Sequence, residues 1–346
     1  MKSDDISGAV PPLIIHNQDI LICPSCNGGL DVTSDRRMIR CFKCNQSFGC
    51  EAGIPLLFYP NEWDSRTDVT ETIKSFYEEN PFPGYEDIDS DQSLRQKAEK
   101  GILARLLDEQ IPHGARILEV GCGTGQLSNF LGMTWGRTVF ATDICLNSLR
   151  LGQNFKQKNG IDNVAFFQMN LFKPVFRPES FDLVICNGVL HHTSDPFLGF
   201  KSLTKLVKKG GFIIVGLYNT YGRIPTDARR LIFKLSGNRF KSLHTCLRDE
   251  NLTSAIKHIW LMDQYNNPHE SKHTIGEVLS WFDHSEVEFF NSIPKATAFA
   301  SFYLNEELFE SNPRGTKLDH FCVQLGMLLS GGREGGVFIM IGRKRA

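Results

Sequence analysis

The stretch ILEVGCGTG, residues 117–125, decides how this chain folds. Its first residues are apolar apart from Glu119, which is typical of a buried strand. The glycines that follow allow a sharp backbone turn against which a ligand can pack closely. A helical pattern begins directly after the turn, so unpaired backbone N–H groups at the helix start can contact that ligand. The stretch therefore predicts a strand, a ligand-binding turn and a helix in succession.

Apolar, β-prone runs alternate with helical patterns on both sides of this stretch. The predicted strands begin at Arg116, Thr138, Val164, Phe181 and Gly211, and two further strands lie within 287–294 and 336–344. Near-continuous apolar strands separated by helices indicate an α/β fold, a doubly wound and mainly parallel seven-stranded sheet covered on both faces. The alternation stops for about seventy residues after Leu217, which predicts a helical insertion after the fifth strand.

The composition indicates a globular protein and disfavours several other classes. The chain has 346 residues, of which 41% are hydrophobic and 22% charged, with a net charge of −1. This balance suits one large domain with accessories, or two domains, and gives no overall attraction to nucleic acid or anionic membrane. No apolar run reaches the roughly 18 residues of a spanning helix, and the acidic, proline-containing N-terminus is unlike a signal peptide. We therefore expect no membrane span and a cytoplasmic location.

Glu119 and Gln126 distinguish the predicted ligand from a dinucleotide. The dinucleotide fingerprint needs Gly or Ala at the position of Gln126, and Glu119 would fit poorly beside a pyrophosphate. A carboxylate there suits a cationic ligand such as S-adenosylmethionine, which carries an ammonium and a sulfonium group. Asp143 ends the second predicted strand, where an acid in this kind of fold accepts hydrogen bonds from both ribose hydroxyls.

These residues resemble a known family, the class I S-adenosylmethionine-dependent methyltransferases, in the branch that includes ubiquinone and menaquinone methyltransferases. The resemblance covers about 110–220 well and extends to 336–344. FDLVICNGVLHHTSDP at 181–196 resembles the family's fourth-strand motif, and Lys-Lys-Gly-Gly at 208–211 resembles the turn before its fifth strand. Asn170 stands where the family usually has an Asp that contacts the adenine amino group, and its oxygen can still accept that bond without charge. The resemblance implies a Rossmann-like methyltransferase fold with S-adenosylmethionine as cofactor.

The motifs and the resemblance together define the candidate cofactor-binding residues. They are Glu119, Gly121, Cys122, Gly123, Thr124, Gly125, Gln126, Asp143, Ile144, Asn170, Leu171 and Asn187. Methyl transfer from a sulfonium is a direct displacement with an activated leaving group, so the protein mainly aligns acceptor, methyl and sulfur. A base is needed only where the acceptor must lose a proton.

Three residues are candidates for contact with the acceptor or for proton transfer. His191 and His192 follow the fourth predicted strand, beside the expected methyl donor. Either imidazole could act as a base, or could instead cap the next helix or pack against the cofactor. Tyr265 belongs to a polar and aromatic cluster at 263–274, which could contact the acceptor or form a capped surface loop.

Charge is unevenly distributed around the predicted insertion. Residues 201–248 hold eleven Lys and Arg and one acid, whereas residues 249–310 hold eleven acids and three Lys. We expect the two blocks to attract each other. Topology places Arg223 close to the ligand crevice, and the arginines at 229 and 230 could meet an anionic substrate, or merely this acidic segment.

Four of the ten cysteines form two C-x-x-C pairs, Cys23 with Cys26 and Cys41 with Cys44. In a reducing compartment such pairs indicate metal more than disulfides, and four thiolates complete the tetrahedron of a closed structural zinc site. So short a segment has little core of its own, and zinc binding can supply about 10–16 kcal/mol. The pattern resembles zinc ribbons on some bacterial methyltransferases, including certain ribosomal RNA enzymes. A pI near 6.8 and the lack of a basic aromatic strip argue against nucleic-acid docking.

We predict a zinc-ribbon module at 18–60, a linker that covers the cofactor at 61–92, and a methyltransferase domain at 93–346. Substrate-side insertions are expected at 218–286 and 295–335. The predicted function is methyl transfer from S-adenosylmethionine to a small-molecule acceptor, with O- or C-methylation favoured. The alternatives are an RNA methyltransferase that docks through the ribbon and a non-catalytic scaffold that keeps the fold. The sequence predicts neither the identity of the acceptor nor the oligomeric state.

Overall fold

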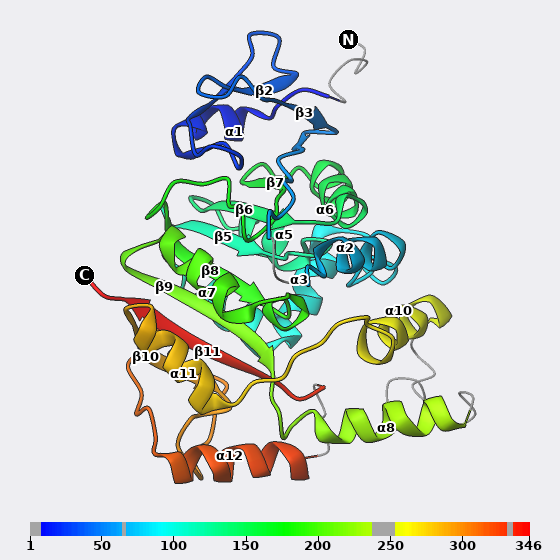
Figure 1. Ribbon diagram of the computed structural model, residues 1–346, viewed down its shortest axis with the longest axis vertical. Coiled ribbons are helices and arrows are strands. Elements are labelled where there is room, and N and C mark those ends of the chain that lie inside the picture. Colours follow the sequence, from blue (N-terminus) through cyan, green and yellow to red (C-terminus); the bar gives the residue numbers. More distant parts are fainter. Residues whose placement is uncertain (1–7, 64–66, 237–252, 331–334) are drawn as a thin grey trace.

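The computed structural model describes residues 8–63, 67–236, 253–330 and 335–346, and Figure 1 shows their arrangement around one large twisted sheet. Its strand order is β10-β11-β9-β8-β5-β6-β7. The strands are β5 (Arg116–Val120), β6 (Thr138–Asp143), β7 (Val164–Gln168), β8 (Phe181–Asn187), β9 (Val207–Tyr218), β10 (Val287–Ile293) and β11 (Val337–Lys344). Neighbours from β7 to β9 pair in parallel, whereas β11 runs antiparallel to both β9 and β10. The predicted doubly wound, mainly parallel seven-stranded sheet is therefore confirmed.

Helices cover both faces of this sheet. The helices that follow the ribbon in the described residues are α2 (Thr70–Glu79), α3 (Asp91–Lys100), α4 (Ile102–Gln110), α5 (Gln126–Gly132), α6 (Leu146–Lys158), α7 (Pro196–Leu206), α8 (Ile224–Leu235), α10 (Ser254–Tyr265), α11 (Ile275–His284) and α12 (Lys317–Leu329). Of these, α8, α10 and α12 lie beyond the sheet in Figure 1. Alternate residues of β8 point to opposite faces: Val184 and Cys186 join the core beneath α7 and α11, while Leu183 and Ile185 join the core beneath α4, α5 and α6. In the described ranges, no helix has the length and apolar character that a membrane crossing needs.

Two details of the strand and helix boundaries follow from glycines. The pattern at 93–110 resembles one amphipathic helix, but Gly101 separates α3 from α4 with extended backbone angles, φ −84° and ψ 113°. The Lys-Lys-Gly-Gly sequence at 208–211 forms a bulge inside β9, because the strand already pairs at Val207 and resumes its register at Phe212. Gly210 supplies the positive φ of 76° that this bulge requires.

The segment between β9 and β10 contains α8, α10 and α11, and a buried ion pair anchors it. The Arg223 guanidinium is fully buried and donates to the Glu270 carboxylate at 2.6 and 2.9 Å. Arg230 also donates to Glu270, at 3.0 Å, and Lys272 pairs with Asp227. Ion pairs therefore join the basic and acidic blocks, and Arg230, one of the two candidate arginines, is engaged by the acidic segment.

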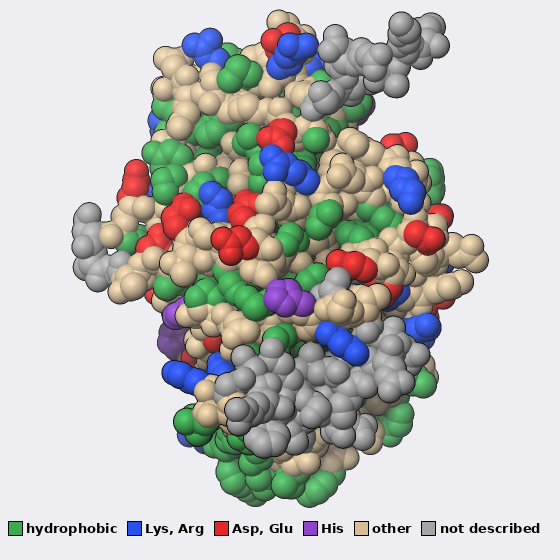
Figure 2. All heavy atoms as spheres, turned by 90° about the vertical axis from the view of Figure 1, so that its right-hand side faces the viewer, with side chains coloured by type: hydrophobic (Ala, Val, Ile, Leu, Met, Phe, Trp, Pro, Cys, Tyr) green, Lys and Arg blue, Asp and Glu red, His purple; other side chains and the backbone are tan. Residues whose placement is uncertain are grey.

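Apolar side chains remain exposed at one end of the molecule. Figure 2 shows hydrophobic side chains gathered at its lower end, where α8 and α12 lie in Figure 1. Leu231 and Leu235 of α8 are 58% and 78% exposed, and Leu318 and Leu329 of α12 are 71% and 77% exposed. This end therefore differs from the mixed charged surface above it in Figure 2.

A small antiparallel sheet precedes the large one. It contains β1 (Leu30–Val32), β2 (Met38–Cys41), β3 (Ser47–Glu51) and β4 (Ile54–Pro55), with α1 (Pro12–His16) beside it. Ile14, Leu21 and Phe48 belong to the same hydrophobic core as residues of the large sheet. The small sheet, which we call the ribbon, is therefore packed onto the α/β domain rather than tethered to it (Figure 1).

Candidate active site

The glycine turn at 121–125 packs closely against neighbouring segments at the carboxyl end of β5. Gly121, Gly123 and Gly125 have φ values of 70°, 55° and 72°, which residues with side chains rarely adopt. A Cβ on Gly121 would overlap Val189, and a Cβ on Gly123 would overlap the carbonyl oxygen of Phe82. Neighbouring residues therefore pack directly against the turn, and only glycine fits at these positions.

A cavity of about 550 Å³ lies over this turn, within the range of small-molecule sites. Its floor comes from the carboxyl ends of β5, β6, β7 and β8, where ligands of doubly wound sheets bind. Its walls include residues of α2 and α3, the loop at 82–83, and Tyr218, Asp263 and Gln264. The cavity therefore joins the predicted linker, the glycine turn and the insertion.

Two carboxylates lie in the floor of the cavity. Burial raises the pKa of Glu119 to about 7 and that of Asp143 to about 6. Ser128 donates its hydroxyl hydrogen to Glu119, and Asp143 accepts backbone N–H bonds from Gly123 and Cys145, both at 2.8 Å. Because burial penalises the charged forms, a cationic ligand that donates hydrogen bonds would be favoured there.

Most of the candidate cofactor-binding residues line this cavity. Those that do are Glu119, Gly121, Cys122, Gly123, Gln126, Asp143, Ile144, Asn170, Leu171 and Asn187. Thr124 and Gly125 lie behind the wall instead. The Thr124 hydroxyl donates to the Pro83 carbonyl at 2.6 Å, and Gly125 packs against the Phe166 ring.

A covering segment at 82–85 is fastened to the glycine turn. Besides the Thr124 bond, Gln126 donates from Nε2 to the Gly84 carbonyl at 2.6 Å, and the Tyr85 hydroxyl donates to the Thr124 carbonyl at 3.1 Å. Phe82 and Pro83 line the cavity from above. The segment therefore closes the cavity next to the glycine turn.

A polar cluster lies at the other end of the cavity. The Tyr77 hydroxyl donates to the Asp263 carboxylate at 2.8 Å, and Gln264 donates from Nε2 to the Tyr218 hydroxyl at 3.0 Å and to Asp263 at 2.9 Å. These residues and His192 all line the cavity. Among the described residues, no acceptor is found for the Tyr218 hydroxyl hydrogen, which is therefore available to a ligand.

His192 is held in one tautomer by the insertion. Its Nδ1 lies 2.7 Å from the His269 carbonyl oxygen, so Nδ1 carries the hydrogen and Nε2 the lone pair. In the part of the chain that the structure describes, Nε2 has no hydrogen-bond partner. Burial lowers the pKa of His192 below its usual 6.5, so the ring is neutral at neutral pH.

The other two acceptor-side candidates do not line the cavity. His191 is fully buried beneath the Tyr218 ring, with ring centroids 4.0 Å apart, and burial lowers its pKa well below 6.5. Tyr265 is buried with its ring edge-on to Phe233 at 4.9 Å. Of the three candidates, His192 alone is positioned to meet a ligand in this cavity.

The sequence predicts Tyr77 in the linker that covers the cofactor, and Asp263 and Gln264 in the polar cluster at 263–274, but it does not predict that they meet. Tyr77 and Asp263 are 186 residues apart, so no local pattern pairs them. Tyr218 lies at the carboxyl end of β9, a position that does suggest the crevice, and Arg223 stacks over its ring at 3.7 Å. Burial also raises the pKa of Tyr218, so its hydroxyl keeps its hydrogen.

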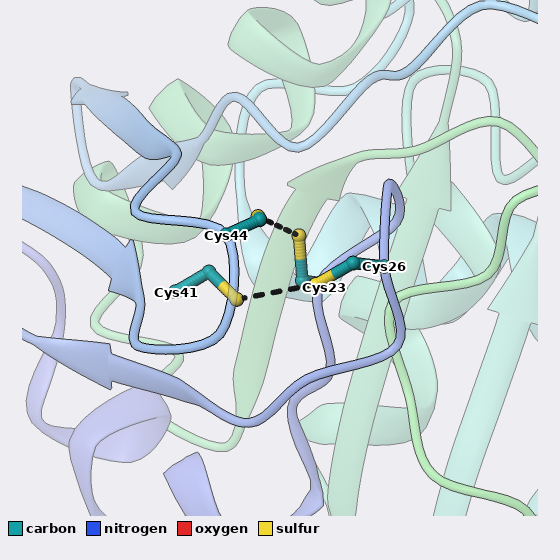
Figure 3. Close-up of side chains that lie close together, drawn as sticks. All are labelled: Cys23, Cys26, Cys41 and Cys44. Carbon is teal, nitrogen blue, oxygen red and sulfur yellow. Dashed lines mark hydrogen bonds between the residues drawn. The ribbon is translucent and has the colours of Figure 1, made fainter.

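The four cysteines of the ribbon converge on one point (Figure 3). Cys23 and Cys44 lie 3.7 Å apart at sulfur, and Cys26 and Cys41 lie 3.4 Å apart. Asn27 and Asn45 follow the two C-x-x-C pairs with φ values of 58° and 60°, so the two pairs turn in the same way. Thiolates at 2.3 Å from one ion in a tetrahedron would be about 3.8 Å apart, close to the spacing seen.

Comparison with known proteins agrees with this site. Residues 118–215 match a family model described as a methyltransferase domain. That range runs from β5 through the glycine turn to the middle of β9 and includes most of the cavity floor. The chain therefore carries a class I S-adenosylmethionine-dependent methyltransferase domain.

The relatives match this chain only in part. It is 31% identical to a ubiquinone biosynthesis O-methyltransferase of Paracidovorax citrulli over 107 residues, covering 31% of this chain and 44% of that protein. It is 34% identical to the uncharacterized protein syc1184_c of a Synechococcus species over 127 residues, 36% of this chain and 30% of that protein. Among solved structures, magnesium protoporphyrin IX methyltransferase from Synechocystis PCC 6803 is similar with a TM-score of 0.47 at 14% identity, covering 80% of this chain and 100% of that one. The chain thus spans less than half the length of these two sequence relatives.

The raised pKa of Glu119 predicts a pH-dependent stability for the ligand-free protein. The folded protein holds this proton up to about pH 7, whereas the unfolded chain releases it near its ordinary 4.5, so stability falls as the pH rises between these values. We expect Glu119→Gln to remove this loss, on the order of 3 kcal/mol, and to flatten the curve. Urea unfolding of both proteins from pH 5 to pH 8 measures it. If the free energy of unfolding changed with pH in the same way in both proteins, the raised pKa of Glu119 would be contradicted.

Proposed function

We propose that this protein transfers a methyl group from S-adenosylmethionine to a hydroxyl group of a small molecule. One observation carries the proposal: a single cavity is lined both by two buried carboxylates and by His192 and Tyr218, which together could bind a hydroxyl group. The match to a ubiquinone biosynthesis O-methyltransferase supports the same chemistry. S-Adenosylmethionine supplies a methyl group on a positively charged sulfur, which leaves as a neutral thioether.

The floor of the cavity fits the cofactor. Glu119 would accept hydrogen bonds from the ammonium group, and Asp143 from the two ribose hydroxyls, since each carboxylate gains by meeting donors in a buried place. The glycine turn leaves room for a ligand to approach its backbone, because Gly121 and Gly123 carry no Cβ. Asn170, Leu171 and Ile144 would surround the adenine.

The far end of the cavity fits a hydroxyl acceptor. Nε2 of His192 can accept the hydroxyl hydrogen, and the Tyr218 hydroxyl can donate to the same oxygen. During methyl transfer His192 would take this proton, which would keep positive charge from developing on the acceptor oxygen. A hydroxyl both donates and accepts, so it satisfies both residues at once. This complementarity favours O-methylation over C-methylation.

The ribbon fits a structural zinc ion. Four sulfur atoms within 4.8 Å of one another, with the spacing described above, suit a tetrahedral ion with no open position. Cys23, Cys26, Cys41 and Cys44 would hold it as thiolates. We propose that zinc stabilises the ribbon and takes no part in methyl transfer.

The cofactor assignment predicts a specific loss of affinity. Asp143→Ala removes the acceptor for two hydroxyls, so binding of S-adenosylhomocysteine should weaken by about 10- to 100-fold. Titration calorimetry with the purified protein measures this. Asp162→Ala, on the exposed surface, is the matched control and should leave affinity unchanged. Equal affinities for the Asp143 variant and the wild type would refute the assigned role.

The acceptor assignment predicts a loss of transfer without a loss of cofactor. His192→Asn keeps an amide N–H for the His269 carbonyl but has no base at the Nε2 position, so transfer should fall by about 10²- to 10⁴-fold. Tyr218→Phe should cost about tenfold. The assay is incorporation of labelled methyl into small molecules of a cell extract, with His284→Asn on the exposed end of α11 as control. Undiminished transfer by the His192 variant would rule out its role as base.

The metal assignment predicts one zinc ion per chain. Cys41→Ser should lower the bound zinc below one per chain. It should also reduce the thermal stability of the ribbon, because the ion stabilises a segment that has little hydrophobic core of its own. Elemental analysis and thermal unfolding measure both effects. Cys50→Ser, outside the four-cysteine cluster, is the control. Zinc-free wild-type protein, purified without chelators, would be incompatible with the proposal.

A further inference from the structure

Asn170 joins the cofactor cavity to the segment that leaves the ribbon. Its side chain is 1% exposed and lines the cavity. Its Nδ2 donates to the Tyr59 carbonyl oxygen and to Oδ1 of Asn61, both at 2.9 Å. Its Oδ1 accepts the backbone N–H of Phe172 at 3.0 Å. Both amide hydrogens and one oxygen lone pair are therefore used within the protein.

Backbone pairing connects the neighbourhood of Asn170 to the four-cysteine cluster. β2 ends at Cys41 and pairs with β3, which pairs with β4. Leu56, directly after β4, bridges Gln168 in parallel, and the Leu57 N–H donates to the Gln168 carbonyl at 3.0 Å. Gln168 is the last residue of β7 and stands two positions before Asn170. The ribbon sheet thus meets the large sheet next to the predicted adenine wall.

Side chains reinforce this junction. The Trp63 ring lies edge-on to Phe172 with centroids 4.8 Å apart. Lys173 pairs with Glu62 at 3.1 Å and lies 5.6 Å above the Tyr59 ring. The segment at 58–63 therefore lies along the loop at 169–173, whose first four residues line the cavity.

These contacts explain the amide at position 170. A carboxylate there would have no hydrogens for the Tyr59 carbonyl or for Oδ1 of Asn61, and would bring negative charge against two oxygen atoms. Asn satisfies both oxygens and still leaves one lone pair toward the cavity. The departure from the family's Asp thus follows from the presence of the ribbon.

We propose that the ribbon is a positioning element of the cofactor site: through Tyr59 and Asn61 it holds Asn170, and so couples the metal cluster to cofactor binding. The inference rests on the proposed function. If the ribbon orders the adenine wall, zinc must strengthen cofactor binding, and the cofactor must in turn slow the loss of zinc, because such coupling is reciprocal. Asn170 is accordingly a positioning residue.

The first test restores the residue that the family usually has. Asn170→Asp removes both donors that hold the residue to Tyr59 and Asn61, so it should weaken S-adenosylhomocysteine binding by about tenfold, despite supplying a charged acceptor for adenine. Calorimetry on the zinc-loaded full chain measures it. Asn159→Asp, which removes an amide donor at the end of α6 outside the cavity, is the matched control and should bind as the wild type does. Equal or tighter binding by the Asn170 variant would overturn the inference.

The second test uses the metal itself as readout. Zinc release to a colorimetric chelator should be slowed several-fold by saturating S-adenosylhomocysteine in the wild type. Asn61→Ala removes the side-chain acceptor of Asn170 and should reduce this protection, while binding zinc in full. Zinc release that is indifferent to the ligand would overturn the coupling. Wild-type protein that does not bind S-adenosylhomocysteine at all would instead refute the proposed function.

Discussion

Two carboxylates held in a buried cavity at the ends of neighbouring parallel strands are the constraint on which this structure depends. Glu119 and Asp143 arrive there because β5 and β6 pair in parallel, so their carboxyl ends meet at one edge of the sheet. Charged groups in such a place are costly without donors and a cationic partner. Ser128 and the backbone N–H groups of Gly123 and Cys145 supply some of the hydrogen-bond donors, and the cavity leaves room for a ligand that supplies the rest.

The strands and the glycine turn were predictable because their patterns are local. Buried parallel strands read as continuous apolar runs, so β5 through β8 begin at the residues that the sequence indicates. The spacing of the four cysteines likewise predicts their convergence. Gly101 was harder to interpret, since the apolar periodicity continues across it, and the break between α3 and α4 depends on one backbone conformation.

The acceptor end of the cavity was only partly predictable, because its contacts join distant segments. His192 and Tyr218 lie where topology places them, but the tautomer of His192 is set by a carbonyl 77 residues away. Tyr265 has the composition of a site residue and nonetheless packs against α8, away from the cavity. Asn170 could be recognised as a departure from a family pattern, yet its partners at Tyr59 and Asn61 come from a segment more than 100 residues earlier.

The way in which the ribbon meets β7 also bears on how the chain can be divided. β7 is the outermost strand on its side of the large sheet, and Leu56 and Leu57 pair with its last residue. A fragment starting beyond residue 60 would leave that strand end bare, along with Phe176, against which the ribbon side chains now pack in a shared core. Uncovered strand edges invite pairing between molecules. The ribbon therefore covers the end of this strand and shares a core with the large sheet, and its removal would expose both.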